Sequence, residues 1–176
     1  MSSAMRLQGR QSASVELSSR LSAGPASIRE IRPHEAGELE TLLELCAEHA
    51  EYELAPFSSD GQAERWRGAL ENGDVQVFFA HHDGETVGFA AMSLEYSTWR
   101  AEQYAHLDCL YVRSSARGRG LGKALMKTIE QRARQLECRQ IQWQTPPWNE
   151  KALAFYGSLG ATSQPKLRFC LPLDRR

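Results

Sequence analysis

The sequence predicts an α+β or mixed α/β fold in which helices cover one sheet. Two β-rich runs, residues 74–82 and 86–97, are joined by an Asp-Gly pair, which is a strong hairpin signal. Two other stretches, 34–53 and 121–137, repeat their apolar residues at helical spacing. With 176 residues and 41% hydrophobic content, the chain is long enough for one domain with its own core.

The first part of the chain predicts one strand and two helices. Residues 27–33 read as a short strand that ends at Pro33. A helix over 34–53 follows, because apolar residues recur there every three or four positions. They are Leu39, Leu42, Leu43, Cys46 and Ala50. Asp60 is expected to cap a second helix, which runs to Leu70 and stops at Glu-Asn-Gly.

Beyond the hairpin, residues 105–112 are apolar enough to form a central strand of the sheet. The helix after it carries one apolar stripe: Leu121, Leu125, Ile129, Ala133 and Leu136. Residues 139–145 predict another strand, which is broken by the Pro146-Pro147 pair.

The C-terminal part predicts one helix and one strand. Asn149 is expected to cap a helix that stops at Gly160, because asparagine favours the first position and glycine the position after the last turn. Residues 166–173 are expected to supply the last strand of the sheet.

Composition limits the classes of partner. The 21 Lys and Arg nearly balance the 22 Asp and Glu, so we expect neither nucleic acid nor a membrane surface as a partner. No apolar run approaches the roughly 20 residues of a membrane helix. The four cysteines are widely separated and form no C-x-x-C pair, which disfavours a metal site or a disulfide framework. Isolated thiols suit a reducing compartment, so we expect a cytoplasmic protein.

Residues 1–26 differ from the rest of the chain, because they are rich in Ser, Ala and Arg and poor in large apolar residues. We expect a disordered leader, or a start codon upstream of the one at Met5, and assign the folded domain to 27–176. An organelle transit peptide has a similar composition and is the alternative.

A loop of arginines and glycines, Arg117–Lys123 ("RGRGLGK"), lies directly between a predicted strand and a predicted helix. A helix N-terminus presents N–H groups without intrahelical partners and a positive dipole end, both of which suit an anion. Glycines let the backbone approach that anion closely, and the basic side chains add charge. The segment therefore predicts a pyrophosphate site, and we name it the arginine–glycine loop. The alternative is a flexible surface loop with solvated arginines.

Two other phosphate-binding patterns do not fit this segment. The P-loop spacing G-x-x-x-x-G-K-[ST] is absent. The dinucleotide fingerprint G-x-G-x-x-G fails because Lys123 follows Gly122, and no acidic residue ends a strand some twenty residues later.

The motif R-x-x-G-x-G, formed by Arg117, Gly120 and Gly122, resembles the acetyl-CoA loop of the GCN5-related N-acetyltransferase (GNAT) family. The segment "WNEKALAFYGSLGA", residues 148–161, resembles the next motif of that family, at the usual separation. The resemblance covers about residues 27–173. It implies a GNAT-like domain with a central, mostly antiparallel sheet flanked by helices, and an acetyl-CoA-dependent N-acetyltransferase activity.

Within that family the chain most resembles the spermidine/spermine (diamine) N-acetyltransferases. The similar segments are residues 47–55, 96–99, 107–112 and 148–150. Asp108 stands where those enzymes usually have Glu, and the Gly-Trp pair of their C-terminal region has no counterpart here.

This resemblance implies two sets of site residues. The cationic amine would be contacted by Tyr52, Glu53 and Asp108, with Gln142, Trp143 and Gln144 along it. Acetyl-CoA would be bound by Leu110, Tyr111, Val112, Arg117, Gly118, Arg119, Gly120, Leu121, Gly122, Lys123, Asn149, Glu150, Lys151 and Ala152.

Acetyl transfer needs a neutral acceptor amine, a stabilised carbonyl oxygen and a proton for the departing thiolate. We assign Tyr156 as the acid, with core packing beside Phe155 as the alternative. Asp108 lies in an apolar strand, where a carboxylate is costly unless it is paired or functional. It is expected to attract the amine and accept its proton, unless it turns outward. Glu53, His106 and water are the competing bases.

The leading hypothesis is acetyl transfer to a small cationic acceptor of the polyamine or diamine type, by a homodimer that uses no metal. One alternative keeps the chemistry but acetylates an aminoglycoside-like amine or a protein lysine. Another is a non-catalytic acyl-CoA-binding module.

Overall fold

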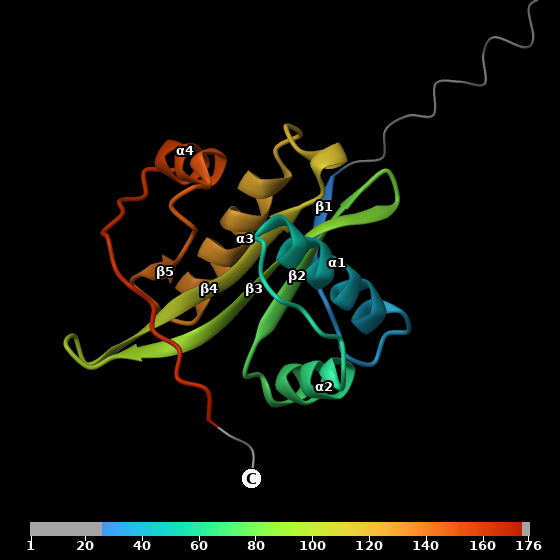
Figure 1. Ribbon diagram of the computed structural model, residues 1–176, viewed down its shortest axis with the longest axis horizontal. Coiled ribbons are helices and arrows are strands. Elements are labelled where there is room, and N and C mark those ends of the chain that lie inside the picture. The colour runs from blue at the N-terminus through green and yellow to red at the C-terminus, as the bar shows by residue number, and fades with distance from the viewer. Residues whose placement is uncertain (1–25, 174–176) are drawn as a thin grey trace, which may run out of the picture. The chain divides into compact units, whose positions relative to one another are not determined.

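The computed structural model describes residues 26–173 of the chain. These residues divide into two compact units, which meet between Gln142 and Trp143. Nearly all of the predicted leader, residues 1–25, lies outside the described residues, so the predicted domain boundary stays a prediction. Figure 1 shows the elements in chain order.

The first unit contains most of the secondary structure. Its elements are β1 (Ser27–Glu30), α1 (Glu38–Tyr52), α2 (Gln62–Asn72), β2 (Gln76–His82), β3 (Glu85–Ser97), β4 (Glu102–Val112), a 3-10 turn (Ser114–Ala116) and α3 (Leu121–Gln135). Strand β5 (Ile141–Trp143) crosses the boundary between the units, and α4 (Glu150–Ser158) lies in the second.

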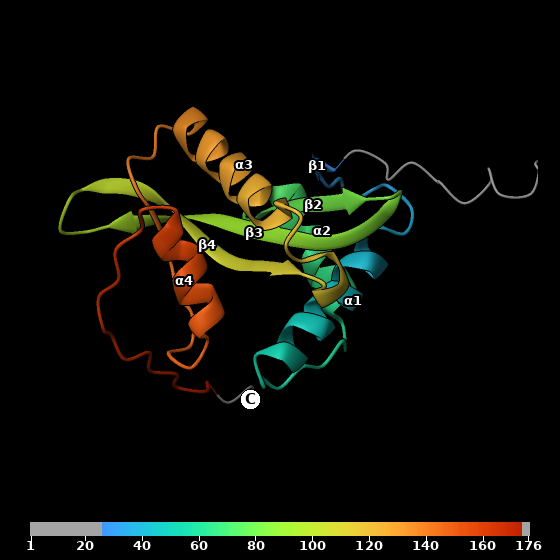
Figure 2. The same cartoon turned by 90° about the horizontal axis from the view of Figure 1, so that it is seen from above.

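The strands form one five-stranded sheet in the order β1-β2-β3-β4-β5. The pairs β1/β2, β2/β3 and β3/β4 are antiparallel. Helix α3 covers one face of this sheet and α1 the other, as Figure 2 shows. The predicted α+β fold with a mostly antiparallel sheet flanked by helices is therefore confirmed.

Strand alternation divides the core of the first unit between the two faces. On the face toward α1, Val77, Phe79, Phe89 and Ala91 pack with apolar residues of the helix. Those helix residues are Leu42 and Leu45, both fully buried. The neighbouring strand residues point the other way, where α3 buries Leu121, Leu125, Met126, Ile129 and Ala133. The predicted stripe of α3 is confirmed except for Leu136, whereas on α1 the prediction missed Leu45, which is fully buried, and included Leu43 and Ala50, which are only partly buried.

A β-bulge interrupts the pairing of β3 with β4. Ala91 pairs with Cys109 while the next residue, Met92, pairs with Leu107, so Asp108 is the extra residue. The side chain of Leu107 is buried, whereas Cys109 packs against the core on the α1 side. An extra residue in one strand shifts the alternation by one position. Asp108 and Cys109 therefore both lie toward α1.

Some predicted ends were correct, but the helix predicted from residue 34 begins at Glu38, the strand predicted from 105 begins at Glu102, and the strand predicted over 139–145 is limited to Ile141–Trp143. Asp83 and Gly84 have φ values of 54° and 82°, which is the conformation of a type I′ turn and confirms the predicted hairpin. Asn149 caps α4 by accepting a hydrogen bond from the N–H of Ala152, and Gly160 follows the helix with φ 82°. Both predicted ends of that helix are confirmed.

Two predicted features were wrong. Asp60 does not cap α2, because Gly61 occupies the N-cap with φ 62° and no side chain caps the helix. Residues 166–173 form no strand in the part of the chain that the structure describes. Their alternating pattern is real, but the side chains of Leu167, Phe169 and Leu171 are each more than four-fifths exposed. A strand needs a paired neighbour as well as a suitable pattern.

Candidate active site

The arginine–glycine loop connects the 3-10 turn to α3. Gly118 and Gly120 have φ values of 79° and 81°, in the left-handed region where a side chain is strained. A Cβ built on either glycine would meet no atom within 4 Å, so the space above the backbone is open. Gly120 is also the N-cap of α3 and offers no side chain to the first helical turn. The N–H groups of that turn therefore face an open surface that suits a pyrophosphate.

The two arginines of this loop make different contacts. Arg119 approaches Nε2 of His82 at 2.7 Å, so it is held against the end of β2. Arg117 turns back beneath the loop, where its Nε donates to the carbonyl oxygen of Val112 at 2.8 Å. Its guanidinium lies 4.6 Å from the ring centroid of Tyr52, within cation–π range. Arg117 thus ties the loop to the end of β4 and to α1.

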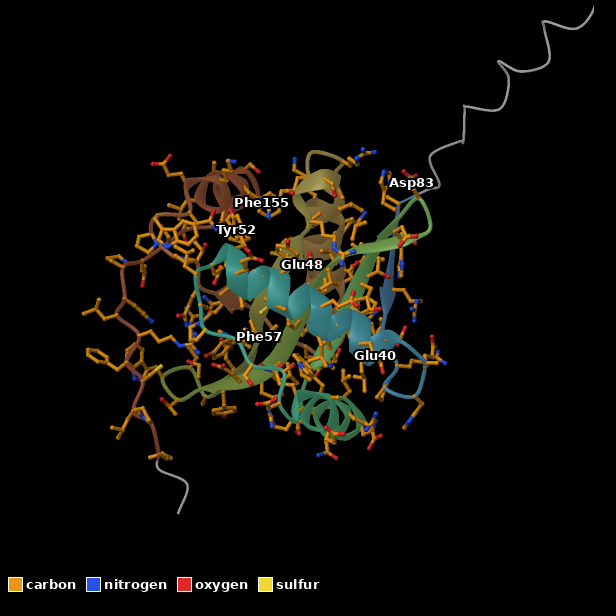
Figure 3. The ribbon with its side chains drawn as sticks, turned by 45° about the vertical axis from the view of Figure 1, so that its right-hand side comes forward. Glu40, Glu48, Tyr52, Phe57, Asp83 and Phe155 are labelled. Atoms are coloured by element: carbon orange, nitrogen blue, oxygen red, sulfur yellow. The ribbon has the colours of Figure 1, made fainter. Side chains whose placement is uncertain are left out.

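An ion pair between Arg113 and Glu48 joins α1 to the end of β4. Nε and Nη2 of Arg113 donate to the carboxylate of Glu48 at 2.7 to 3.0 Å. Nη1 of Arg113 donates to the carbonyl oxygen of Thr86, and the hydroxyl of Tyr111 donates to Glu48 at 3.3 Å. Glu48 and Tyr52 lie one turn apart on α1 (Figure 3). The same helix therefore contacts both β4 and the guanidinium of Arg117.

A second group of residues surrounds the bulge, and we name it the bulge cluster: His49, Glu53, Glu95, His106 and Asp108. Nδ1 of His106 lies 3.7 Å from Glu95, and its Nε2 lies 3.9 Å from Asp108. The side chain of Asp108 is 58% exposed, so a ligand in solvent can reach its carboxylate. It faces the same side as α1, because its charge acts on Cys46 and His49 of that helix.

His49 and Glu53 form the α1 side of this cluster. They lie four residues apart, with Nε2 of His49 at 3.5 Å from a carboxylate oxygen of Glu53. The imidazole stacks on the ring of Tyr111 at 5.4 Å between centroids and meets the edge of Phe89. Burial lowers the pKa of His49, and Arg117 acts in the same direction, while Glu53 and Asp108 oppose the change.

The thiols between α1 and β4 are poor nucleophiles. Burial, together with the charge of Asp108, raises the pKa of Cys46 to about 12. Burial likewise raises the pKa of Cys109, whose sulfur lies 3.6 Å from a carboxylate oxygen of Asp108. Since the thiolate is the reactive form, neither residue is suited to covalent catalysis.

Tyr156 lies on α4 in the second unit. Its ring lies 5.1 Å from that of Trp143 and 5.2 Å from that of Phe155. The aromatic neighbours pack against the ring, and the role of its hydroxyl stays a prediction. Tyr156 therefore remains the predicted acid.

The structure brings together many of the predicted site residues. Leu110, Tyr111 and Val112 end β4 just before the arginine–glycine loop, and Asp108 precedes them at the bulge. Gln142 lies in β5, where its side chain donates to Gln140. The remaining predicted residues of the second unit are Trp143, Gln144, Asn149, Glu150, Lys151 and Ala152, which stay candidates.

Three side chains of this region were not identified from the sequence: His49, Glu48 and Arg113. His49 precedes Glu53 by four residues on a helix, which is the spacing of side chains that meet. This spacing could have predicted the His49–Glu53 contact from the sequence. The Glu48–Arg113 pair joins residues far apart in the chain, so no local pattern indicated it.

Among residues 26–173, no group of three or more His, Cys, Asp and Glu side chains is arranged to hold a metal ion. No helix in the same range is both long and apolar enough to cross a bilayer.

The sequence that builds this site also matches known proteins. The family model of the acetyltransferase (GNAT) family matches residues 39–161. The chain belongs to this family. The matched range includes the bulge, the arginine–glycine loop and α4. This GNAT protein is therefore an acetyl-CoA-dependent N-acetyltransferase, whose family uses acetyl-CoA as co-substrate.

Individual relatives agree with the assignment. The GNAT chain is 33% identical over 120 residues to a thialysine N-epsilon-acetyltransferase of Caenorhabditis elegans, covering 68% of this chain and 74% of the relative. It is 27% identical over 103 residues to an L-ornithine N5-acetyltransferase of Arabidopsis thaliana, covering 57% and 45%. The chain thus spans less than half of the plant relative's length.

The fold is shared with solved acetyltransferases. An aminoglycoside acetyltransferase from an uncultured soil metagenomic sample superposes with a TM-score of 0.70 at 20% identity, covering 85% of this chain and 97% of the other. At that identity the likeness concerns the fold alone.

Proposed function

We propose that this GNAT enzyme transfers the acetyl group of acetyl-CoA to a primary amine of a small cationic acceptor, of the polyamine or diamine type. The observation that carries the proposal is the bulge cluster, where Glu53 faces His49, and Glu95 and Asp108 face His106. Carboxylates attract a cation, repel an anion and give no such attraction to a neutral acceptor. Two relatives support the same class, because their names describe acetylation of side-chain amines of thialysine and ornithine.

Each part of the site has one task in this proposal. The arginine–glycine loop binds the pyrophosphate of acetyl-CoA through backbone N–H groups, with Arg119 and Lys123 adding charge. Asp108 and Glu53 bind the acceptor ammonium. Backbone N–H groups among Leu110 to Val112 stabilise the carbonyl oxygen as it becomes negative. Tyr156 supplies a proton to the departing thiolate.

The test is release of free thiol from acetyl-CoA over a panel of amines at equal concentration. The panel contains an α,ω-diamine, a polyamine, a lysine-like amino acid, an aminoglycoside and a monoamine of the same chain length as the diamine. We expect kcat/KM for the diamine to exceed that for the monoamine by about tenfold, or 1.4 kcal/mol. Equal values for the two would refute charge-based selection, and a preference for the aminoglycoside would redirect the substrate assignment.

We further propose a homodimer in the cytoplasm. The exposed apolar residues of 166–173 offer a segment that pairing with a second copy would cover. All four cysteines are free, which agrees with a reducing compartment. Sedimentation at micromolar concentration should give the mass of two chains, and a 19.8 kDa species would contradict the dimer.

A further inference from the structure

His49 is placed as a proton acceptor within the bulge cluster. Its side chain is only 14% exposed and lies on α1, one turn before Tyr52 and Glu53. The ring is fixed between the stacked ring of Tyr111 and the edge of Phe89, which pair across β3 and β4. A ring held on two sides keeps its orientation, which a proton acceptor requires.

The contact with Glu53 indicates which ring nitrogen of His49 carries the hydrogen in the neutral form. Nε2 faces the carboxylate of Glu53 at 3.5 Å, so the hydrogen of the neutral ring belongs on Nε2. The lone pair then lies on Nδ1. In His106, by contrast, each ring nitrogen faces a carboxylate, Glu95 on one side and Asp108 on the other. These distances, 3.7 and 3.9 Å, exceed hydrogen-bond length, so they do not fix which ring nitrogen of His106 carries the hydrogen.

The charges around His49 come from every element packed on it. Glu53 of α1 and Asp108 of β4 favour the protonated ring, and Arg117 of the loop before α3 disfavours it. Tyr111 of β4 contributes a neutral phenol, and β3 contributes the uncharged Phe89. Burial is the largest influence and keeps the ring neutral at neutral pH by lowering its pKa. A neutral imidazole beside two carboxylates gains stabilisation once it takes up a proton.

The geometry points to His49 as the general base that deprotonates the acceptor ammonium, with Glu53 orienting its ring; this inference rests on the proposed function. In the step, one N–H bond of the ammonium breaks and a new N–H bond forms at Nδ1 of His49, directly or through one bridging water. The electron pair of the broken bond stays on the amine nitrogen, which attacks the thioester carbonyl. The hydrogen on Nε2 of His49 stays on that nitrogen and points to Glu53. The carboxylate of Glu53 stabilises the positive charge of the imidazolium, as the carboxylate does in a Ser-His-Asp triad.

The experiment compares His49→Gln and His49→Phe with the wild type over a pH series. Gln keeps a group that can donate to Glu53, and Phe keeps a ring over Tyr111, but neither side chain titrates. For a diamine, kcat/KM near neutral pH should fall about tenfold or more in both variants, and the acid-side inflection of the wild type should disappear. His34→Gln is the matched control, since His34 is a 76% exposed histidine near the start of α1.

A second acceptor separates a chemical role from a structural one. A primary amine with an electron-withdrawing neighbour is largely neutral at pH 8, so it needs no deprotonation before it attacks the thioester. Its kcat/KM should change by less than about threefold in both variants. Equal losses for the two amines, or an unchanged pH profile with the diamine, would overturn the assignment.

Failure of the proposed function is distinguishable from failure of this inference. If the wild type acetylates no cationic amine, the proposed substrate class is wrong, whatever His49 does. The pairing is then tested by NMR titration of the His49 ring. Because Glu53 raises the pKa of His49, Glu53→Gln should lower that pKa further. An unchanged pKa of His49 in the Glu53→Gln variant would also overturn the role of His49.

Discussion

The bulge cluster is centred on the bulge of β4, and the arginine–glycine loop follows the end of that strand after the 3-10 turn, yet the two are built in opposite ways. The loop presents main-chain N–H groups, and its special property is the left-handed backbone of Gly118 and Gly120. The bulge cluster presents side chains that α1, β3 and β4 bring together. In our proposal, the loop binds a part of acetyl-CoA that is common to all reactions of the family. The bulge cluster is proposed to select the acceptor amine.

This difference predicts different kinetic consequences. A change in the loop should weaken acetyl-CoA binding while leaving the choice among acceptors unchanged. A change among the catalytic and acceptor side chains should alter turnover or acceptor preference at nearly constant acetyl-CoA affinity. The experiments on Tyr156, Asp108 and Gly120 below each test one side of that distinction.

The largest effect is expected for Tyr156→Phe, which removes a hydroxyl and keeps the ring beside Trp143. If Tyr156 protonates the thiolate, kcat at saturating amine should fall roughly 10- to 1,000-fold, about 1.4 to 4 kcal/mol. The affinity for acetyl-CoA should hardly change, because no binding contact is removed. Wild-type kcat and pH profile in the variant would assign Tyr156 to packing.

Asp108→Asn should have the next largest effect. The substitution removes a charge at the bulge with little change of shape, so kcat/KM for a diamine should fall more than about tenfold. The loss should be much smaller for a monoamine of equal length, which has no second charge to attract. A loss of the same size for both acceptors would show that Asp108 supports the bulge rather than the substrate.

The same contrast explains what the sequence could predict. The loop is contiguous, so its motif, its strand and its helix were all visible between residues 105 and 137. The acceptor end depends on Asp108 being an extra residue, and nothing in an apolar run shows where pairing with β3 shifts. The contacts of Arg113 with Glu48 and of Arg117 with Tyr52 likewise join distant segments. The alternating apolar pattern of 166–173 was identified correctly. Whether that segment pairs with another strand depends on the rest of the fold and not on the segment alone.

Gly120→Glu tests the loop directly. A glutamate adds strain at φ 81° and brings a negative charge to the N-terminus of α3, where a pyrophosphate would lie. Acetyl-CoA affinity measured by calorimetry should fall about tenfold, or 1.4 kcal/mol. The ratio of kcat/KM values for diamine and monoamine should stay the same. A changed ratio would mean that the loop also contributes to acceptor choice.

The smallest effect concerns stability near the same loop. His81 lies on β2 next to His82, which holds Arg119. Burial lowers the pKa of His81, and Arg29 acts in the same direction while Glu38 opposes it. Nδ1 contacts the hydroxyl of Thr86, whereas Nε2 is buried without a hydrogen-bond partner among the described residues. Protonation would place a second N–H group where no acceptor lies.

The sign of the resulting pH dependence follows from proton binding. Below about pH 6.5 the unfolded chain binds a proton at His81 that the folded chain resists, so the free energy of unfolding should fall as the pH falls through that range. The loss is complete once the pH lies below the lowered pKa of the folded state. In His81→Gln this contribution is absent, and the decrease measured by urea unfolding should be shallower than in the wild type. An identical decrease in both proteins would mean that His81 takes up its proton as readily in the folded chain as in the unfolded one.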